Sequence, residues 1–351
     1  GLLREAFLCP YIYRMRIAII RLSSMGDILL TTPILKAIKE SFPDASIDFF
    51  IKKKYLEIIK ENQEINKIYA LENKKGENIK NLLNQVANKK YDYVFDLHKN
   101  YRSKRISKGL KGAIYRYDKE SIARKLFLLT GLNFLKETHV VDRYFRTIEV
   151  LGIPTGDHGI AQIKPTESEK IKGHLARFND KDFIVWAIGG KHFTKRLPSN
   201  TIIKVIDELN MPFVLVGDSS DQILSSKILN SIKGQNLVID LTGKTSISQS
   251  AWLIQKSALI ISNDSFIMHL ASAFPKPLLT LWGSTRPELG FSAYKKNAFV
   301  LQAKVHFIYR FFYVFIPRKW WDKESKCMHR ISNTLLTNTI LSILDKPNSN
   351  R

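Results

Sequence analysis

The sequence predicts an α/β protein built from two doubly wound parallel sheets that face each other across a cleft. Short apolar runs rich in β-branched and aromatic residues alternate with helix-period segments, and this arrangement stops once and restarts. The length of 351 residues suits two domains of about 150 residues each. Ligands of such sheets bind beyond the carboxyl ends of the strands, so the loops there are the places to look for chemistry.

The first half of the chain contains five predicted strands. Each is a short apolar run that ends in a small or polar turn, and helical stretches separate most of them. In the segment 31–42, for example, Ile34, Leu35 and Ile38 share one helix face. The predicted strands are 16–22, 46–51, 67–71, 91–97 and 113–117.

A concentration of proline and glycine at 153–159, after a helix-like segment at 140–152, marks the predicted domain boundary. The strand pattern then restarts with 183–188, 212–217, 236–241, 258–262 and 277–282. The predicted organisation is an extension at 1–14, domains at 15–157 and 158–330, and a C-terminal helix and tail at 331–351.

The composition is that of a folded protein with a strongly basic charge balance. Hydrophobic residues make up 44% and charged residues 25%, which excludes disordered and fibrous classes. Two cysteines, Cys9 and Cys327, cannot by themselves form a disulfide framework or a four-ligand zinc site. The net charge of +23 favours a polyanionic partner, which is a nucleic acid, an anionic membrane surface or a phosphorylated substrate.

The sequence also bears on location and partners. It has no run of about 18 uncharged apolar residues and no signal-peptide pattern at its start, so we expect a cytoplasmic protein. No recognisable DNA- or RNA-reading motif accompanies the charge, and we expect no nucleic-acid partner. The segment 305–321 combines aromatic residues with flanking cations, which fits either an anionic membrane surface or buried packing.

The loop at 23–27 (SSMGD) follows the first predicted strand. Gly26 permits a tight turn and a close backbone approach. Asp27 lies near the N-cap of the next helix, and capping alone would explain it. Taken alone, the loop therefore leaves a structural and a functional role open.

The loop at 189–198 (GGKHFTKRLP) follows a strand of the second half. It combines glycines, a hydroxyl and several cations before a proline-started helix, which suits a phosphate group. The spacing of a Walker loop is absent. A solvated basic loop is the alternative interpretation.

The loop at 262–269 (SNDSFIMH) leads from a strand into a helix. Asp264 and Ser265 can cap that helix, and exposed amides at its start would hold a diphosphate. His269 lies four residues beyond Ser265, so it is expected near the same helical face, toward the cleft. A hydrogen-bonded core histidine is the alternative.

Three motifs occur together in one order: SSMGD at 23–27, TKRLP at 194–198, and NDSFIMHLA at 263–271. In this combination the chain resembles the bacterial lipopolysaccharide heptosyltransferases. The resemblance runs over nearly the whole chain, from Met15 to about residue 345. It includes the segments 91–103, 138–153, 236–288 and 327–332.

The resemblance implies a two-domain, Rossmann-like GT-B enzyme that transfers heptose from ADP-heptose to a Kdo or heptose hydroxyl of the lipopolysaccharide core. It implies inversion of the anomeric centre, with no cofactor and no required metal. The implied acceptor is linked to lipid A, which places the enzyme at the inner face of the inner membrane. That location would account for part of the positive charge.

The resemblance also implies roles for particular residues. Asp27 matches the family's proposed general base, and Lys195 matches a lysine that contacts phosphate. The residues implied to hold the nucleotide sugar are Thr194, Asp221, Asp264, Ser265, Phe266 and His269. The residues expected on the acceptor side are Ser24, Lys99 and Arg102; a solvated helix face would explain Lys99 and Arg102 equally well.

This chain departs from the family pattern at three places. Phe266 replaces the glycine of the usual Asp-Thr-Gly, Arg286 replaces the aspartate of the usual Gly-Pro-Thr-Asp-Pro, and Lys99 stands where a glycine is common. Two alternatives therefore stay open: a GT-B transferase of another nucleotide sugar, and a catalytically silent carbohydrate-binding homologue. Retention of Asp27 and Lys195 argues against the silent homologue.

Overall fold

A computed structural model describes residues 14–72, 79–136, 139–190, 192–234, 237–283, 285–295, 298–303 and 327–345. Several predictions fall outside these residues: the role of the extension before Arg14, the choice between membrane contact and buried packing for 305–321, and Ser284 in the altered Gly-Pro-Thr-Asp-Pro motif.

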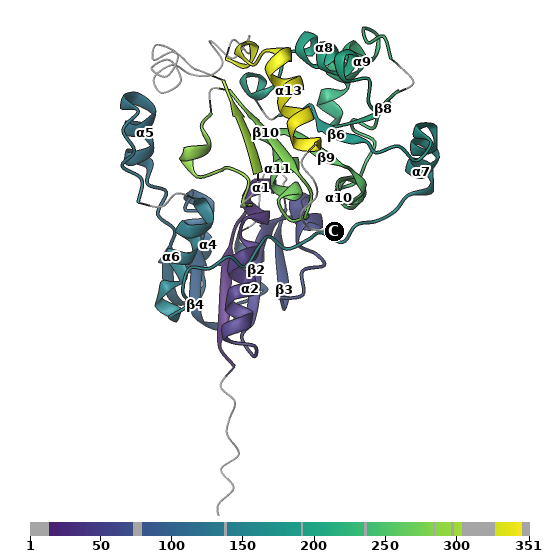
Figure 1. The fold of residues 1–351 in the computed structure, drawn as a ribbon. Helices are drawn as coiled ribbons and strands as arrows, with labels where there is room; N and C mark the ends of the chain where they lie inside the picture. Colours follow the sequence, from purple (N-terminus) through teal and green to yellow (C-terminus); the bar gives the residue numbers. More distant parts are fainter. Residues whose placement is uncertain are drawn as a thin grey trace, which may run out of the picture.

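The first half folds into a parallel sheet with the strand order β3-β2-β1-β4-β5 (Figure 1). All five strands predicted there are confirmed, with small shifts at their ends. β1 lies at the centre, because its residues after Arg16 are all apolar and are covered on both faces. The strands are β1 (Arg16–Ile20), β2 (Ser46–Lys52), β3 (Lys67–Leu71), β4 (Lys90–Asp96) and β5 (Lys111–Arg116).

The second half forms a parallel sheet with the order β11-β10-β9-β6-β7-β8. Its five predicted strands are confirmed. β11 was not predicted, although its sequence AFVLQ is mostly apolar; it is an edge strand whose residues are half-buried or exposed. The strands are β6 (Ile184–Ala187), β7 (Phe213–Val216), β8 (Val238–Asp240), β9 (Leu259–Asn263), β10 (Leu278–Trp282) and β11 (Ala298–Gln302).

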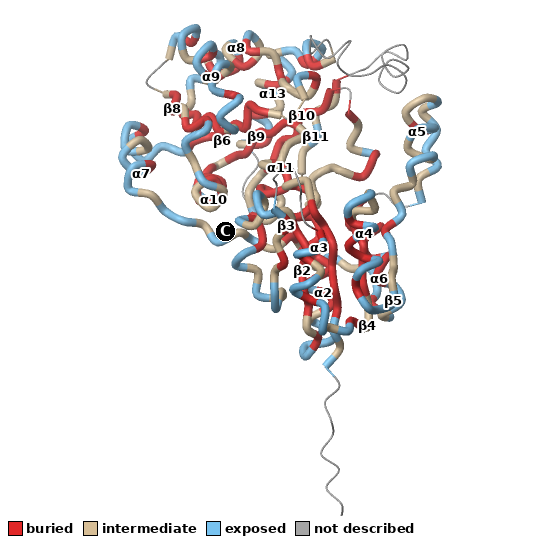
Figure 2. Tube along the Cα trace, turned by 180° about the vertical axis from the view of Figure 1, so that it is seen from behind, coloured by how far each residue is buried: buried red, intermediate tan, exposed pale blue. Residues whose placement is uncertain are grey.

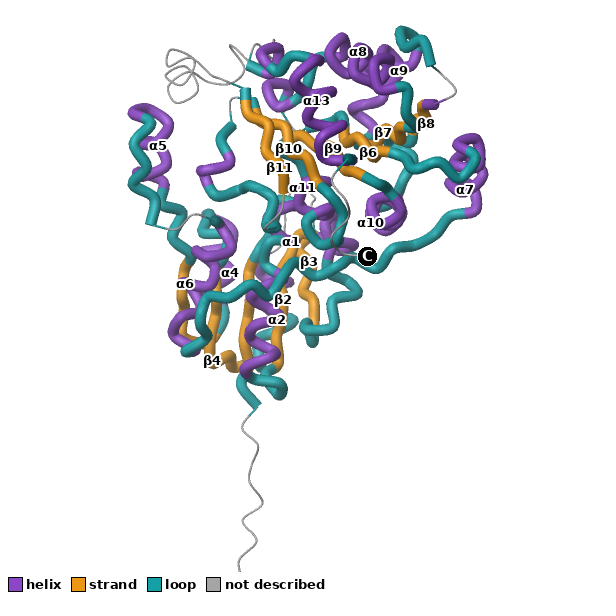
Figure 3. The backbone as a smooth tube through the Cα atoms, viewed as in Figure 1, coloured by secondary structure: helices purple, strands orange, loops and turns teal. Residues whose placement is uncertain are grey.

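Helices cover both faces of each sheet, as Figure 3 shows. One boundary differs from the prediction: residues 23–27 are not all loop, since a short helix begins at Met25 and carries Asp27 in its first turn. The helices are α1 (Met25–Leu29), α2 (Thr32–Ser41), α3 (Ile79–Asn84), α4 (Tyr101–Gly109), α5 (Ser121–Thr130), α6 (Val140–Ile148), α7 (Glu169–Leu175), α8 (Ser199–Leu209), α9 (Gln222–Leu229), α10 (Ile247–Lys256), α11 (Phe266–Ala271) and α13 (Asn333–Leu344).

The apolar core joins the two halves. One buried cluster covers one face of each sheet and is continuous where α1 of the first half contacts α11 of the second. Two further clusters fill the opposite faces of the two sheets. Figure 2 shows the buried strands at the centre of each half and exposed positions along α5 and α7. The halves are thus held together beside the loops that follow their strands.

A long connection between α6 and α7 crosses from one half to the other (Figure 1). The predicted boundary at 153–159 lies at its start. Near the other end of the chain, α13 packs against α8 and stays with the second half. No helix in the described part of the chain is both long and apolar enough to cross a bilayer.

Candidate active site

The carboxyl ends of both sheets open into one cleft of about 1030 Å³. Its walls come from the segments after β1, β2, β4 and β5 in the first half and after β6, β7, β8, β9 and β10 in the second. Eight of the predicted site residues line it: Ser24, Asp27, Lys195, Asp221, Asp264, Ser265, Phe266 and His269.

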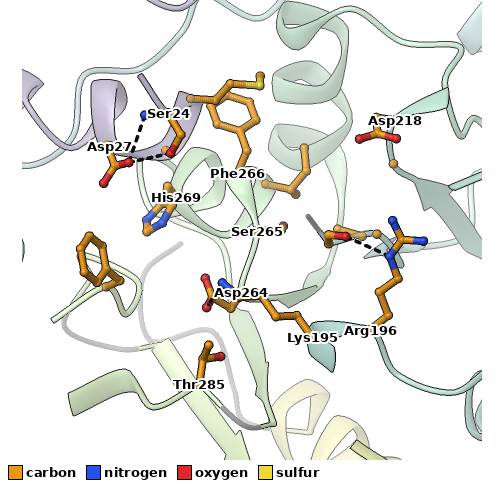
Figure 4. A pocket seen from close by; sticks show the side chains of 18 of the residues that line it. Ser24, Asp27, Lys195, Arg196, Asp218, Asp264, Ser265, Phe266, His269 and Thr285 are labelled. Carbon is orange, nitrogen blue, oxygen red and sulfur yellow. Dashed lines mark hydrogen bonds and ion pairs between the residues drawn. The ribbon is translucent and has the colours of Figure 1, made fainter. Parts of the chain in front are cut away.

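Asp27 is held in place from two directions. Ser24, the residue before α1, donates its hydroxyl to the Asp27 carboxylate at 2.6 Å and its amide at 3.1 Å. Arg21, at the end of the β1 segment, forms an ion pair with it at 2.9 Å. Asp27 therefore lies in the first turn of α1 and also lines the cleft. The Ser24 hydroxyl, which was expected to face an acceptor, donates its hydrogen bond to the Asp27 carboxylate (Figure 4).

These contacts fix the charge of Asp27. Burial raises the pKa of the carboxyl, but the Arg21 guanidinium and the two hydrogen bonds from Ser24 outweigh burial and lower the pKa of Asp27 to about 2. The carboxylate is therefore ionised throughout the physiological range. It can accept a proton only from a group that becomes strongly acidic.

Sequence reasoning missed Arg21. Its side chain is 9% exposed, donates to the Leu97 carbonyl and lies over the Tyr144 ring, 5.8 Å from its centre. The local signal was a lone arginine closing an apolar strand. Besides Asp27 on α1, its partners come from the turn after β4 and from α6, and only the tertiary fold brings those parts together.

His269 projects from α11 against α1. A β-carbon on Gly26 would lie 2.5 Å from His269 Cδ2, so this glycine is required for the two helices to approach. Burial lowers the pKa of His269 to about 4, although Asp264 and Asp27 oppose that effect. The imidazole is therefore neutral at pH 7, and its buried Nδ1 has no hydrogen-bond partner among the described residues.

We expect acidification to destabilise the protein partly through His269. An unfolded histidine binds a proton near pH 6.5 but the folded one only near pH 4, so the unfolded state gains protons first as the pH falls. This costs roughly 3 kcal/mol of unfolding free energy between pH 6.5 and pH 4. Urea unfolding at several pH values should show a shallower acid loss for His269→Gln than for the wild type. Parallel curves would show that His269 does not contribute.

Lys195 and Asp264 contact each other on the second-half wall of the cleft. Lys195 lies after β6 and forms an ion pair with Asp264, which follows β9 (Figure 4). Their side chains keep 17% and 13% of their surface exposed. A cation and an anion on the second-half wall of the cleft are thus paired with each other. Thr194 is buried next to Lys195 and is not among the residues that line the cleft.

Asp221 occupies a space that only glycines leave open. A β-carbon on Gly189 would lie 1.9 Å from its Oδ2, and one on Gly217 would lie 2.8 Å away. The Asp221 carboxylate is buried, accepts the Asp218 amide at 3.1 Å and forms an ion pair with Arg196 at 3.0 Å. Asp221 thus directs Arg196 along the cleft, and direct contact of Asp221 with a nucleotide stays a prediction.

The two altered motifs both reach the cleft. Phe266 begins α11 and packs against the shared core, beside the short helix α1 (Figure 4). Ser265 binds the Ser262 hydroxyl at 3.0 Å. Arg286 lies 4.7 Å from the centre of the Phe127 ring on α5, so it bridges the two halves. Two of the three departures, Phe266 and Arg286, therefore lie in the cleft wall.

Lys99 and Arg102 are not among the residues that line the cleft. After β4, Asp96 accepts the amides of His98 and Lys99, and the chain turns so that His98 lines the cleft instead. Lys99 adopts φ 49°, a left-handed backbone that favours glycine, and pairs with Asp118 at 3.8 Å. Arg102 is exposed on α4. Their acceptor role stays a prediction.

Other basic side chains line the cleft on the Asp27 side and were not predicted. Lys119 and Arg124 come from the segment that follows β5, with Tyr117 beside them. Burial and the nearby Arg21 lower the pKa of Lys119. Among the described residues, no group of three or more His, Cys, Asp or Glu side chains is placed to hold a metal.

A model of glycosyltransferase family 9 (heptosyltransferase) matches residues 79–307, more than half of the chain. The chain belongs to this family. It is 28% identical over 278 residues to lipopolysaccharide heptosyltransferase 3 of Escherichia coli K12, covering 74% of this chain and 80% of that protein. Among solved structures it is similar to the family 9 glycosyl transferase of Veillonella parvula, at TM-score 0.74 and 20% identity over 94% and 97% of the two chains. It is also similar to E. coli heptosyltransferase WaaC with ADP, at 0.68 and 17% over 94% and 100%.

Membership of family 9 makes this protein a glycosyltransferase. The solved structures confirm the predicted fold class, a GT-B arrangement of two Rossmann-like halves. The roles of individual residues in this family 9 enzyme rest on the geometry described above.

Proposed function

We propose that this glycosyltransferase transfers heptose from ADP-heptose to a Kdo or heptose hydroxyl of the lipopolysaccharide core, with inversion. The observation that carries the proposal is the single cleft into which Asp27 projects from one half and Lys195 and Asp264 from the other. The names of similar proteins support it, since they include lipopolysaccharide heptosyltransferase 3 and a heptosyltransferase with ADP.

The first half supplies the base. In an inverting displacement, the acceptor oxygen attacks the anomeric carbon on the side opposite the departing ADP. As the new bond forms, the attacking hydroxyl becomes acidic enough to give its proton to Asp27, despite the low pKa of that carboxyl. Arg21 and Ser24 keep the carboxylate oriented for that transfer.

The second half receives the leaving group. Lys195 exchanges Asp264 for the diphosphate, and Arg196, held by Asp221, adds a second cation. We propose that these side chains meet the developing charge without a required metal. Asp264, freed from Lys195, is then able to accept a hydroxyl of the sugar.

The unpredicted cations on the Asp27 side fit an acidic acceptor. Lys119 and Arg124 line the cleft there, and a Kdo carboxylate or a core phosphate would compensate their charge. Such an acceptor is linked to lipid A, which places the enzyme in the cytoplasm at the inner face of the inner membrane.

Phe266 and Arg286 favour one alternative donor class. Both line the cleft, and both replace a smaller or oppositely charged residue of the family pattern. A nucleotide sugar other than ADP-heptose would then be the donor, with the same base and the same leaving-group contacts.

The test is ADP release from ADP-heptose by the purified protein, with and without a deacylated, water-soluble Kdo-terminated core acceptor. We expect release that depends on acceptor and is unchanged by EDTA. A requirement for metal would overturn the metal-free step. If ADP-heptose gives no release but another nucleotide sugar in a donor panel is active, that other nucleotide sugar is the donor.

A further inference from the structure

The β5 edge of the first sheet has an unusual composition. Residues 101–136, which comprise α4, β5, α5 and the loop after α5, contain ten Lys and Arg but only two Asp and Glu. Both acidic side chains are already paired, Asp118 with Lys99 and Glu120 with Arg143. We call residues 101–136 the β5-edge segment.

Large apolar side chains are exposed on the same segment. Ile122 is 78% exposed and Leu132 is 60% exposed. Figures 1 and 2 show α5 standing away from both sheets, so no other described element covers its outer side. The remaining exposed large apolar side chains of the segment are Tyr101, Leu126 and Phe134.

Cations and apolar groups are interleaved along this surface. Lys125 is exposed between Ile122 and Leu126 on α5, and α4 presents exposed Lys104 and Lys108. Helices that lie on anionic bilayers have this pattern, because apolar side chains enter the acyl boundary while cations meet the headgroups. A nucleic acid would compensate the cations but would leave the aliphatic side chains in water.

The surface is continuous with the cleft. Lys119 and Arg124 belong to the β5-edge segment and also line the cleft beside Asp27. Arg286 from the second half lies against Phe127 on α5, which connects this helix to the donor side as well. A partner that binds the β5-edge segment would therefore lie close to the part of the cleft beside Asp27.

We propose that the β5-edge segment is a docking surface for an anionic phospholipid bilayer. The inference extends the proposed function, because a lipid-linked acceptor would then be presented at the mouth of the cleft. It assigns membrane contact to described residues that are separate from the segment 305–321.

Vesicle sedimentation tests the surface without any acceptor. The wild type should bind vesicles of phosphatidylglycerol and phosphatidylcholine, bind pure phosphatidylcholine poorly, and lose binding as salt rises. Replacing Lys104, Lys108, Lys111 and Lys125 by Gln should weaken binding on the order of a hundredfold, since each basic residue contributes roughly threefold to fivefold. Ile122→Gln with Leu126→Gln should weaken it by about tenfold or more.

Matched controls are available on the second half. Replacement of the exposed Lys170, Lys181, Lys204 and Lys227 by Gln removes the same charge, and Ile223→Gln removes an apolar side chain that is 86% exposed. These variants should bind vesicles more tightly than the β5-edge variants. Equal weakening by both sets would show that net charge alone drives binding and would overturn the assignment, as would wild-type binding by the β5-edge variants.

Activity assays separate this proposal from the proposed function. The β5-edge variants should keep wild-type ADP release with a deacylated acceptor and show a raised KM only for acceptor embedded in vesicles. Binding that occurs only when vesicles contain the acceptor lipid would overturn the bilayer assignment in favour of substrate recognition. Normal vesicle binding without transferase activity would instead reject the proposed function and would still support the β5-edge segment as a bilayer-docking surface.

Discussion

Replacing Asp27 by Asn is expected to lower turnover by roughly 10²–10⁴-fold while the affinity for ADP stays within a few-fold of the wild type. The amide keeps the size of the side chain but cannot accept the proton of the attacking hydroxyl. The proposed nucleotide contacts, Lys195 and Asp264, lie on the other half of the cleft and should be unaffected. Single-turnover kinetics and ADP titration by calorimetry measure the two effects separately. Turnover equal to that of the wild type would remove Asp27 from the base role.

A stability control is needed for this variant. Asp27→Asn leaves the Arg21 guanidinium buried without its ion pair, and loss of one partner of such a pair typically costs about 3–5 kcal/mol. The double variant Arg21→Met with Asp27→Asn removes both charges and should recover part of that loss. It should remain as inactive as the single variant. Recovery of turnover in the double variant would show that the defect came from the stranded arginine.

The sequence predicted the sheets well because each strand carries its own apolar signal. The edge strand β11 was missed although its sequence AFVLQ is apolar; only the fold shows that it lies at the sheet edge, where Val300 is 50% exposed. Helix α1 was predicted only as a loop. With five residues it is too short to show a periodic pattern, and the hydrogen bonds from Ser24 to the Asp27 carboxylate in its first turn appear only in the structure.

Some residues of the candidate site were predicted from local sequence motifs, and others are revealed only by the fold. Asp27, Lys195 and His269 lie in motifs next to strands, and the fold rule for parallel sheets sends all three to one cleft. Arg21 was missed because its role in the site depends on two contacts made in the fold. It forms an ion pair with Asp27 and donates to the Leu97 carbonyl in the turn after β4. Lys99 and Arg102 were expected on the acceptor side as cations suited to acceptor phosphates or carboxylates, with a solvated helix face as the alternative. The turn bonded to Asp96 places His98 in the cleft instead, and no local pattern announces that choice.

Replacing Lys195 by Met is expected to lower kcat by roughly 10²–10³-fold, because a cation aimed at the leaving diphosphate acts mainly as negative charge develops there. Donor KM should rise as well. Without Lys195, the Asp264 carboxylate would lose its ion-pair partner and would repel the diphosphate. Steady-state kinetics of ADP release, with donor and acceptor varied in turn, measure both parameters.

The double variant Lys195→Met with Asp264→Asn separates the two causes. Removing the Asp264 charge should restore much of the donor affinity, since the repulsion in the single variant is electrostatic. It should not restore kcat, because no cation has been returned to the leaving group. Lys195→Arg, which keeps the charge, should retain more activity than either variant. If the double variant instead regains full turnover, Lys195 serves only to neutralise Asp264, and the stabilisation of the departing ADP must come from Arg196 and the backbone amides of the loops around it.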